Sequence, residues 1–130
     1  MRVLVVDDTD HVRNMLVEML SLDGFDVVGH AGDGPSAVDA ATRNDPDVIV
    51  MDLRMPGQDG LETTRMIRAE RPHQMVVLYT AYLDARIRDD AAAAGAQLCL
   101  DKTAGLLELE RELSRLRYEL TGDSSSAPDN

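Results

Sequence analysis

Five short apolar segments alternate with five segments of helical periodicity along this chain of 130 residues. We expect the apolar segments to be strands, at residues 2–6, 25–30, 48–51, 75–79 and 96–100. Strands that alternate with helices in this way are joined by right-handed crossovers into a parallel sheet, which the helices cover on both faces. The pattern therefore predicts an α/β fold.

Each helical segment carries one apolar face. The first helix should end near Gly24 and bury apolar residues that are spaced three and four positions apart. These residues are Val12, Met15, Leu16, Met19 and Leu20. The remaining helices are predicted at 35–43, 61–70, 83–94 and 105–120. The leucines of the last helix run to Leu120, so a short helix pairing between two chains is an open alternative for its end.

The composition of the strands predicts their order in the sheet. Segments 2–6, 48–51 and 75–79 are unbroken apolar runs, as expected for central strands buried on both faces. Asp26 and Gln97 interrupt the other two segments, which suits the edges of a sheet. A flavodoxin-like (βα)5 sandwich with strand order 2-1-3-4-5 has those two strands at its edges.

The chain has the length of a single domain with one proper core. We assign residues 1–120 to that domain. Residues 121–130, TGDSSSAPDN, are polar and rich in serine, and we expect a disordered tail or linker stub there. The one cysteine, Cys99, has no partner for an internal disulfide and is interpreted as a small buried apolar residue.

The charge is strongly acidic, with 24 Asp and Glu against 13 Lys and Arg and a formal net charge of -11. Direct binding of nucleic acid or of an anionic membrane surface is therefore not expected, whereas binding of cations is favoured. The apolar run that ends at Val6 is too short for a signal peptide, and no stretch reaches membrane-spanning length. We expect a soluble, cytoplasmic protein.

Polar residues follow four of the predicted strands at their carboxyl ends, where the functional edge of a parallel sheet lies. They are Asp7, Asp8, Asp52, Thr80 and Lys102. Carboxylates packed together repel one another unless a positive charge lies between them, and Mg²⁺ is a hard cation that carboxylate oxygens bind. An aspartate beside such a metal can act as a nucleophile on a phosphoryl group, which makes Asp52 the first candidate for a working residue.

Four motifs occur in order along the chain, each at a strand end. They are VVDD at 5–8, MDLRMPGQDG at 51–60, TA at 80–81 and DK at 101–102. Together they resemble the receiver domain, or CheY-like domain, of bacterial two-component response regulators. The resemblance covers residues 1–120.

This resemblance implies a phosphorylation-dependent signalling switch rather than a turnover enzyme. Asp52 would accept a phosphoryl group from a phosphohistidine on a sensor histidine kinase or a histidine phosphotransfer protein, and Lys102 would contact that group. Asp7, Asp8, Asp52 and the main-chain carbonyl of Arg54 would bind Mg²⁺, with Mn²⁺ as a substitute. Segment 9–13 resembles receivers that are joined to a DNA-binding helix-turn-helix domain, so the resemblance also points to transcription regulation.

The resemblance further implies a switch hydroxyl at Thr80 and an output face made by helix 83–94, strand 96–100 and helix 105–120, which is also a possible homodimer interface. Arg54 and Tyr82 occupy positions that tune the lifetime of the phosphorylated state in this family. Two residues depart from the family pattern. Cys99 stands where the family has an inward-turning aromatic residue, and Thr103 stands where it has a cis proline, so we expect a trans peptide or a different loop there.

Three other functions compete with this one. A pseudo-receiver would act as an interaction module without phosphorylation. The departures at Cys99 and Thr103 keep this alternative open, whereas retention of all five site residues argues against it. A phosphatase of the haloacid-dehalogenase type would need an aspartate where this chain has Arg54. A flavodoxin-like flavin carrier would need a loop that binds phosphate, whereas the loop after the first strand is Asp-Asp-Thr-Asp.

Several of these residues also have purely structural interpretations. Asp7 and Asp8 are alternatively caps of the first helix. Gly57 and Gly60 are interpreted as turn residues, because a lone G-x-x-G has no phosphate-loop context here. The three histidines, His11, His30 and His73, lack metal-ligand spacing and are taken as structural or exposed. Five methionines at core-facing or strand positions are assigned to packing: Met15, Met19, Met51, Met66 and Met75.

Overall fold

The computed structural model describes residues 1–121, in which strands and helices alternate. The strands are β1 (Arg2–Val6), β2 (Asp26–Ala31), β3 (Val48–Met51), β4 (Met75–Thr80) and β5 (Leu98–Asp101). The α-helices are α1 (Asp10–Leu22), α2 (Gly34–Asn44), α3 (Gly60–Glu70), α4 (Ala85–Ala94) and α5 (Leu106–Thr121). One short 3-10 helix, η1 (Lys102–Ala104), joins β5 to α5 and was not predicted.

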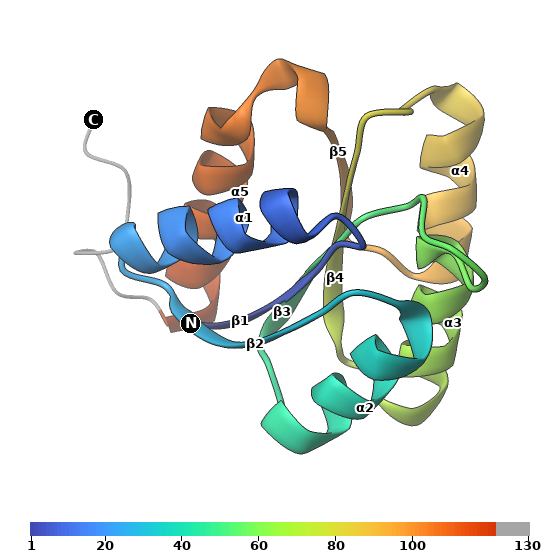
Figure 1. Cartoon of the computed structure of the whole chain (residues 1–130), viewed down its shortest axis with the longest axis horizontal. Coiled ribbons are helices and arrows are strands. Elements are labelled where there is room, and N and C mark those ends of the chain that lie inside the picture. The colour runs from blue at the N-terminus through green and yellow to red at the C-terminus, as the bar shows by residue number, and fades with distance from the viewer. Residues whose placement is uncertain (122–130) are drawn as a thin grey trace.

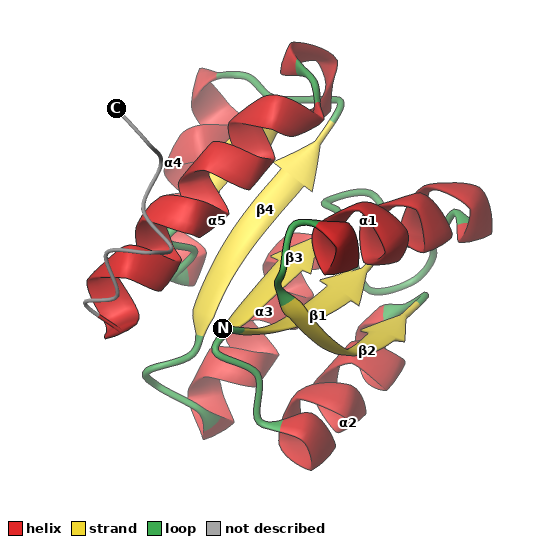
Figure 2. Ribbon diagram, turned by 90° about the vertical axis from the view of Figure 1, so that its left-hand side faces the viewer, coloured by secondary structure: helices red, strands yellow, loops and turns green. Residues whose placement is uncertain are grey.

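The strands form one parallel sheet in the order β2-β1-β3-β4-β5, which confirms the flavodoxin-like order predicted from the sequence (Figure 2). The two strands with polar interruptions lie at the edges. Asp26 is exposed at the start of β2, and Gln97 falls just before β5 rather than within it. The central strands β1, β3 and β4 are buried on both faces, which is why their sequences are continuous apolar runs.

Helices cover the sheet on both sides, with α1 and α5 on one face and α2, α3 and α4 on the other (Figure 1). Alternate residues of each strand point to opposite faces, so Val3 and Val5 pack under α1 and α5 while Leu4 and Val6 pack under the other three helices. Two apolar cores result, one on each side of the sheet. Packing on both faces fixes the sheet, so the carboxyl ends of its parallel central strands lie side by side.

The prediction that three methionines pack into the core is wrong. Met15 and Met19 of α1 are 42% and 36% exposed, and Met66 of α3 is 45% exposed. Only the stripe of α1 with Leu16 and Leu20 is fully buried, because a helix on a sheet covers little more than one row of side chains. The three methionines lie beside the buried rows of their helices and remain partly open to solvent.

Aspartates begin three of the helices. The Asp33, Asp59 and Asp84 carboxylates accept hydrogen bonds from the main-chain N–H groups of Ser36, Glu62 and Ile87, respectively. Such caps satisfy N–H groups that have no partner within the helix. Part of the acidic charge therefore fixes the starts of α2, α3 and α4 at the edge of the sheet where the strands end.

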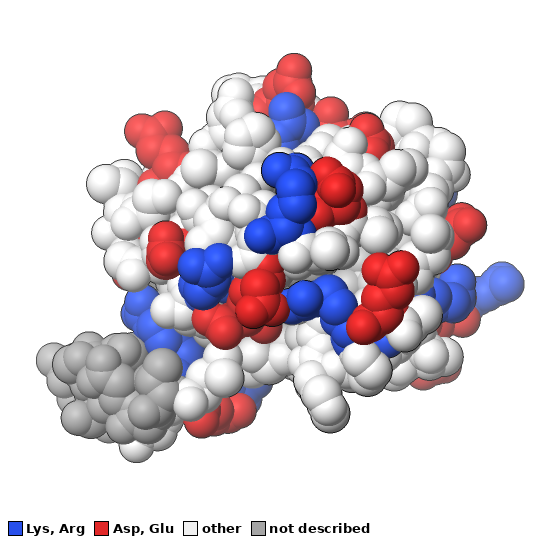
Figure 3. Space-filling view, turned by 90° about the horizontal axis from the view of Figure 1, so that it is seen from below, with Lys and Arg blue, Asp and Glu red and all other residues white. Residues whose placement is uncertain are grey.

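The outer surface mixes charges of both signs. In the view of Figure 3, Lys and Arg side chains lie next to Asp and Glu side chains across one face of the molecule. Exposed pairs include Arg43 with Asp39 and Arg71 with Asp45. Within residues 1–121, no helix is long and apolar enough to cross a membrane. Helix α5 runs through Thr121, which the sequence assigns to the tail, and residues 122–130 lie outside the described residues.

Candidate functional site

Four neighbouring strands deliver polar residues to one edge of the sheet. Asp7 follows β1, Asp52 follows β3, Thr80 ends β4 and Lys102 follows β5. The ladder continues one residue beyond β1 and β3, because the N–H of Asp7 donates to the carbonyl of Ala31 and that of Asp52 donates to the carbonyl of Val6. The sheet itself therefore fixes where these side chains begin.

Three carboxylates gather at this edge. One oxygen from each of Asp7, Asp8 and Asp52 lies within 4.8 Å of the others. Asp7 is 1% exposed and Asp52 is 9% exposed, whereas Asp8 faces solvent. Oxygen donors at this spacing, two of them buried and one open to solvent, fit a hard divalent cation such as Mg²⁺.

Neither Asp7 nor Asp8 caps α1, so that alternative is wrong. The N-terminal cap position is Thr9, whose side chain makes no capping bond. The Asp7 carboxylate instead accepts a hydrogen bond from the N–H of Thr9 at 2.9 Å, which holds the carboxylate in the turn before the helix.

Lys102 supplies the positive charge of the cluster. Its Nζ lies 2.8 Å from Oδ2 of Asp7 and 3.4 Å from Oδ2 of Asp52. Burial by itself would lower the pKa of this ammonium, but the hydrogen bond and charge of Asp7, together with the charge of Asp52, outweigh burial and raise the pKa above its ordinary value. Lys102 is therefore held in its charged form between two carboxylates.

The environment of the Asp52 carboxyl group disfavours its charged form. Burial raises its pKa above the ordinary value, Lys102 partly offsets this effect, and the charge of Asp7 adds to it. The main-chain N–H of Arg54 also hydrogen-bonds to the Asp52 carboxylate. A carboxylate that lacks full compensation gains most from a cation or another electrophilic group at the site.

A cavity of about 340 Å³ opens beside these groups. It is lined by Asp8, Thr9, Asp52, Arg54, Ala81, Tyr82 and Lys102. Thr80, which precedes the lining residue Ala81, is completely buried, and its hydroxyl accepts a hydrogen bond from the N–H of Tyr82 at 3.2 Å. The Arg54 guanidinium stacks 5.0 Å from the centre of the Tyr82 ring, so these two exposed side chains form one wall of the cavity.

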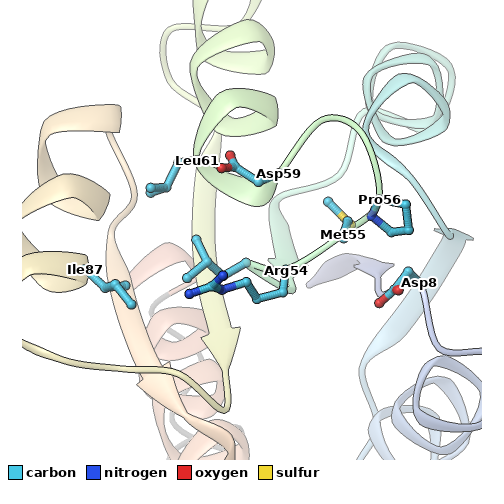
Figure 4. Close-up of a pocket in the computed structure, with 8 residues that line it drawn as sticks. Asp8, Arg54, Met55, Pro56, Asp59, Leu61 and Ile87 are labelled. Atoms are coloured by element: carbon cyan, nitrogen blue, oxygen red, sulfur yellow. The ribbon is translucent and has the colours of Figure 1, made fainter.

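Arg54 and Asp8 also line a neighbouring cavity of about 590 Å³. Figure 4 shows the Arg54 side chain directed toward the side of Ile87, with Asp8 and Pro56 on the opposite side. Most residues that line the larger cavity are apolar, whereas Asp8, Asp52 and Lys102 line the smaller one. Chemistry on an anionic group is therefore expected in the smaller cavity.

The sequence signature of the response regulator receiver domain matches residues 3–114. The chain belongs to the response regulator receiver family. A solved receiver domain, that of the putative response regulator NarL from Mycobacterium tuberculosis, superposes with a TM-score of 0.82 at 34% identity, covering 88% of this chain and 94% of that one. The fold and the acidic pocket of Asp7, Asp8 and Asp52 are thus those of a receiver.

Curated relatives are longer proteins that contain a receiver. The transcriptional regulatory protein PdtaR of Mycobacterium tuberculosis is 38% identical over 120 residues, which cover 89% of this chain and 58% of the relative. A protein-glutamate methylesterase/protein-glutamine glutaminase of Haloarcula marismortui is 38% identical over 127 residues, covering 96% of this chain and 34% of the relative. Receivers of this kind therefore accompany different output activities.

Cys99 and Thr103, the two residues that depart from the receiver pattern, each make contacts that fit them into the structure. Cys99 is buried in β5, burial raises the pKa of its thiol, and its carbonyl accepts a hydrogen bond from Arg88 of α4 at 3.3 Å. No cis peptide occurs among the described residues, so the expected trans bond before Thr103 is confirmed. The Asp101 carboxylate accepts hydrogen bonds from the N–H and hydroxyl of Thr103, which fixes η1 without a proline.

The site of this receiver also includes residues that the sequence did not indicate. Arg13 of α1 reaches the main chain of Asp7, and the Lys102 ammonium lies 5.8 Å from the centre of the buried Tyr79 ring. Arg13 follows Asp10 by three positions on a helix, a spacing typical of an exposed ion pair, so the sequence carried no sign of its inward contact. The three histidines are all exposed, as expected.

Proposed function

We propose that this receiver is a phosphorylation-dependent switch that accepts a phosphoryl group on Asp52. The arrangement that carries the proposal is the charged Lys102 between buried Asp7 and Asp52, facing a cavity that Asp8 lines. These groups combine a nucleophilic carboxylate, a fixed cation and further oxygen donors in one place. The donor would be a phosphohistidine on a sensor histidine kinase or a histidine phosphotransfer protein.

The transfer exchanges one bond for another. An oxygen of the Asp52 carboxylate attacks phosphorus, an O–P bond forms, the P–N bond to the donor breaks, and its electron pair returns to the imidazole nitrogen. Lys102 binds a phosphoryl oxygen and balances the charge that develops on it. Hydrolysis of the acyl phosphate later returns the carboxylate, so this chain resets slowly as a switch rather than acting as a turnover enzyme.

Asp7, Asp8, Asp52 and the main-chain carbonyl of Arg54 would hold Mg²⁺, or Mn²⁺ in its place. The bound cation supplies charge neutralisation for the carboxylates and the phosphoryl oxygens. The separation of the three carboxylates supports this assignment. Arg54 and Tyr82, which are stacked at the cavity wall, would set how easily water reaches the phosphoryl group.

The output would be a change of surface. The Thr80 hydroxyl oxygen accepts from the N–H of Tyr82, and a phosphoryl group on Asp52 would offer an acceptor for the hydroxyl proton. Thr80 would then turn toward the phosphoryl group and reshape the face made by α4, β5 and α5. Cys99 lies on that face in place of an aromatic switch residue. The same face is the proposed homodimer interface, and transcription regulation is the proposed output of the system to which this chain belongs.

The proposal predicts covalent labelling of Asp52. Incubation with acetyl phosphate and Mg²⁺ should add one phosphoryl group per chain, measured by intact mass spectrometry. The Asp52→Asn variant, which lacks the nucleophilic carboxylate, and the wild type in excess chelator should gain none. Asp59→Asn is a matched control, because Asn preserves the cap of α3 and Asp59 does not belong to the carboxylate cluster.

A wild-type chain that remains unlabelled by acetyl phosphate and by phosphorylated kinases would instead support the pseudo-receiver. Sustained release of inorganic phosphate from a generic phosphate ester would support a phosphatase.

The exposed apolar row of α1 indicates where a phosphohistidine partner would dock. Met15, Met19 and Leu22 are 42%, 36% and 75% exposed, and positions spaced by four and three lie on one side of a helix. Because α1 begins two residues after Asp8, this row runs along the helix away from the end that lies next to the phosphorylation site. A partner helix packed along the row would bring its histidine to Asp52.

This docking predicts a selective loss of transfer. The double variant Met15→Glu, Leu22→Glu should slow phosphotransfer from a sensor kinase that labels the wild type by about tenfold or more, the cost of about 1.4 kcal/mol of lost apolar contact. Labelling by acetyl phosphate should not change, because the small donor needs no docking surface. Met66→Glu on α3 is the matched control, and an equal loss in that variant would show that α1 is not the docking surface.

A further inference from the structure

Arg13 lies in the first turn of α1 with its guanidinium turned toward the main chain that carries the carboxylates. Its side chain is 14% exposed. Nη1 donates to the main-chain carbonyl of Asp7 at 2.7 Å, and Nη2 pairs with the exposed carboxylate of Asp10. The contact with Asp7 links the helix to the end of β1, six residues earlier in the chain.

The guanidinium is closely surrounded. A Cβ atom on Gly32 would lie 3.0 Å from Nη1, so a larger residue at position 32 would crowd the guanidinium. Nε is buried without a hydrogen-bond partner among the described residues. Burying an unsatisfied donor costs free energy. The charge-assisted hydrogen bond to the carbonyl of Asp7 offsets that cost and explains why the Arg13 guanidinium is buried here.

The carbonyl that Arg13 binds belongs to the peptide unit joining Asp7 to Asp8. The Asp7 side chain is independently held by Lys102 and by the N–H of Thr9. Asp8 is exposed, so surrounding side chains do not hold its carboxylate in place. The direction of that carboxylate therefore depends on the orientation of the peptide unit that joins Asp7 to Asp8. We propose that Arg13 is a positioning residue that orients Asp8 for cation binding, an inference that rests on the proposed Mg²⁺ site.

The charge of Arg13 acts in the opposite direction, because a positive charge near a cation site repels the cation. The two effects predict opposite signs. If repulsion dominated, removing the charge of Arg13 would tighten Mg²⁺ binding, whereas loss of positioning would weaken it. The pairing of Nη2 with Asp10 balances much of the guanidinium charge, so positioning should dominate.

Isothermal titration calorimetry with Mg²⁺ on the whole chain tests the inference. Arg13→Met removes both the charge and the donors and should weaken Mg²⁺ binding about tenfold, as loss of a group that orients a metal ligand typically does. Arg13→Gln keeps a neutral donor and should recover part of that affinity. Asp10→Asn removes the outer ion pair but leaves the bond from Arg13 to the carbonyl of Asp7, so its loss of Mg²⁺ affinity should be smaller than that of Arg13→Met.

Labelling by acetyl phosphate provides a second measurement. The Mg²⁺ concentration for half-maximal labelling should rise in Arg13→Met, while the rate at saturating Mg²⁺ should stay near that of the wild type. Equal or tighter Mg²⁺ binding by Arg13→Met and Arg13→Gln would overturn the inference. If the folded wild type binds no Mg²⁺, the proposed metal site itself fails, which is a distinct result. Should Arg13→Met fail to fold, Arg13→Gln alone decides the direction.

Discussion

Replacing Lys102 with methionine is expected to destabilise the chain by about 3 kcal/mol at pH 8 without divalent cation, the order of cost of leaving a buried charge without its partner. Lys102 lies within 3.4 Å of carboxylate oxygens of both Asp7 and Asp52, which are almost fully buried. Without the ammonium, the two buried carboxylates repel one another, and the nearby charge of Asp8 adds to that repulsion. Urea denaturation at fixed pH measures the loss.

The same variant should show a distinctive pH dependence. The pKa of Asp52 is already raised in the folded state, and removal of Lys102 raises it further. A carboxyl group whose pKa is higher in the folded than in the unfolded state binds its proton more tightly when folded, so stability is lost as pH rises through that pKa. The loss of unfolding free energy in Lys102→Met, relative to the wild type, should therefore be largest at pH 8 and become smaller as the pH falls toward 4.

Two controls accompany the Lys102→Met variant, namely the addition of Mg²⁺ and the substitution Lys102→Arg. Mg²⁺ at 100 times its dissociation constant should restore about 2.7 kcal/mol to the variant by mass action. Lys102→Arg, which retains the charge, should lose much less stability than Lys102→Met. An equal deficit at pH 4 and pH 8 would instead indicate lost packing of the lysine stem near Tyr79.

Much of the site could be predicted from sequence because it depends on the sheet. The apolar runs at β1, β3 and β4 identify central strands, and the carboxyl ends of parallel strands meet whatever the details of the helices. Asp7, Asp52 and Lys102 therefore meet at this edge, and Thr80 ends the strand that lies between those of Asp52 and Lys102. The strand order followed from where polar residues interrupt β2 and precede β5.

The remaining features depend on distances that a sequence pattern does not contain. Asp7 and Asp8 are adjacent in the chain, yet one is buried and the other is exposed, because the turn before α1 directs them differently. Periodicity marked Met15 as core-facing, but it does not give the width of the stripe that a helix buries. The inward contact of Arg13 spans six residues and crosses from helix to strand, beyond any helical spacing rule.

Gly60 is another residue whose role follows from its packing in the structure and not from the sequence pattern. It was interpreted as a turn residue, but it is the first residue of α3, and its backbone is not in the left-handed region. A Cβ atom there would lie 2.3 Å from the carbonyl oxygen of Asp52 and 3.0 Å from Cα of Leu53. The N–H of Gly60 also donates to the carbonyl of Leu53 at 2.8 Å. Glycine therefore allows α3 to begin directly against the main chain of Asp52.

Gly60→Ala is expected to destabilise the chain by about 2–3 kcal/mol, the cost of forcing extra atoms into a closely packed site. The contacts are with main-chain atoms, so no side-chain rotation relieves them, and α3 must move away from Asp52. This cost opposes the gain of about 1 kcal/mol that alanine brings over glycine inside a helix. Because the displaced main chain carries Asp52, labelling by acetyl phosphate should also slow. Thermal unfolding and intact mass measure the two effects.

Gly57→Ala is the control that separates contact from backbone strain. Gly57 lies in the same loop at φ +75, with no atom within 4 Å of a Cβ built there. Alanine at Gly57 should cost about 1 kcal/mol, the penalty for a left-handed backbone, and leave labelling of Asp52 unchanged. If Gly60→Ala were as stable as the wild type and labelled at the same rate, close packing of α3 against Asp52 would not be what requires glycine at position 60.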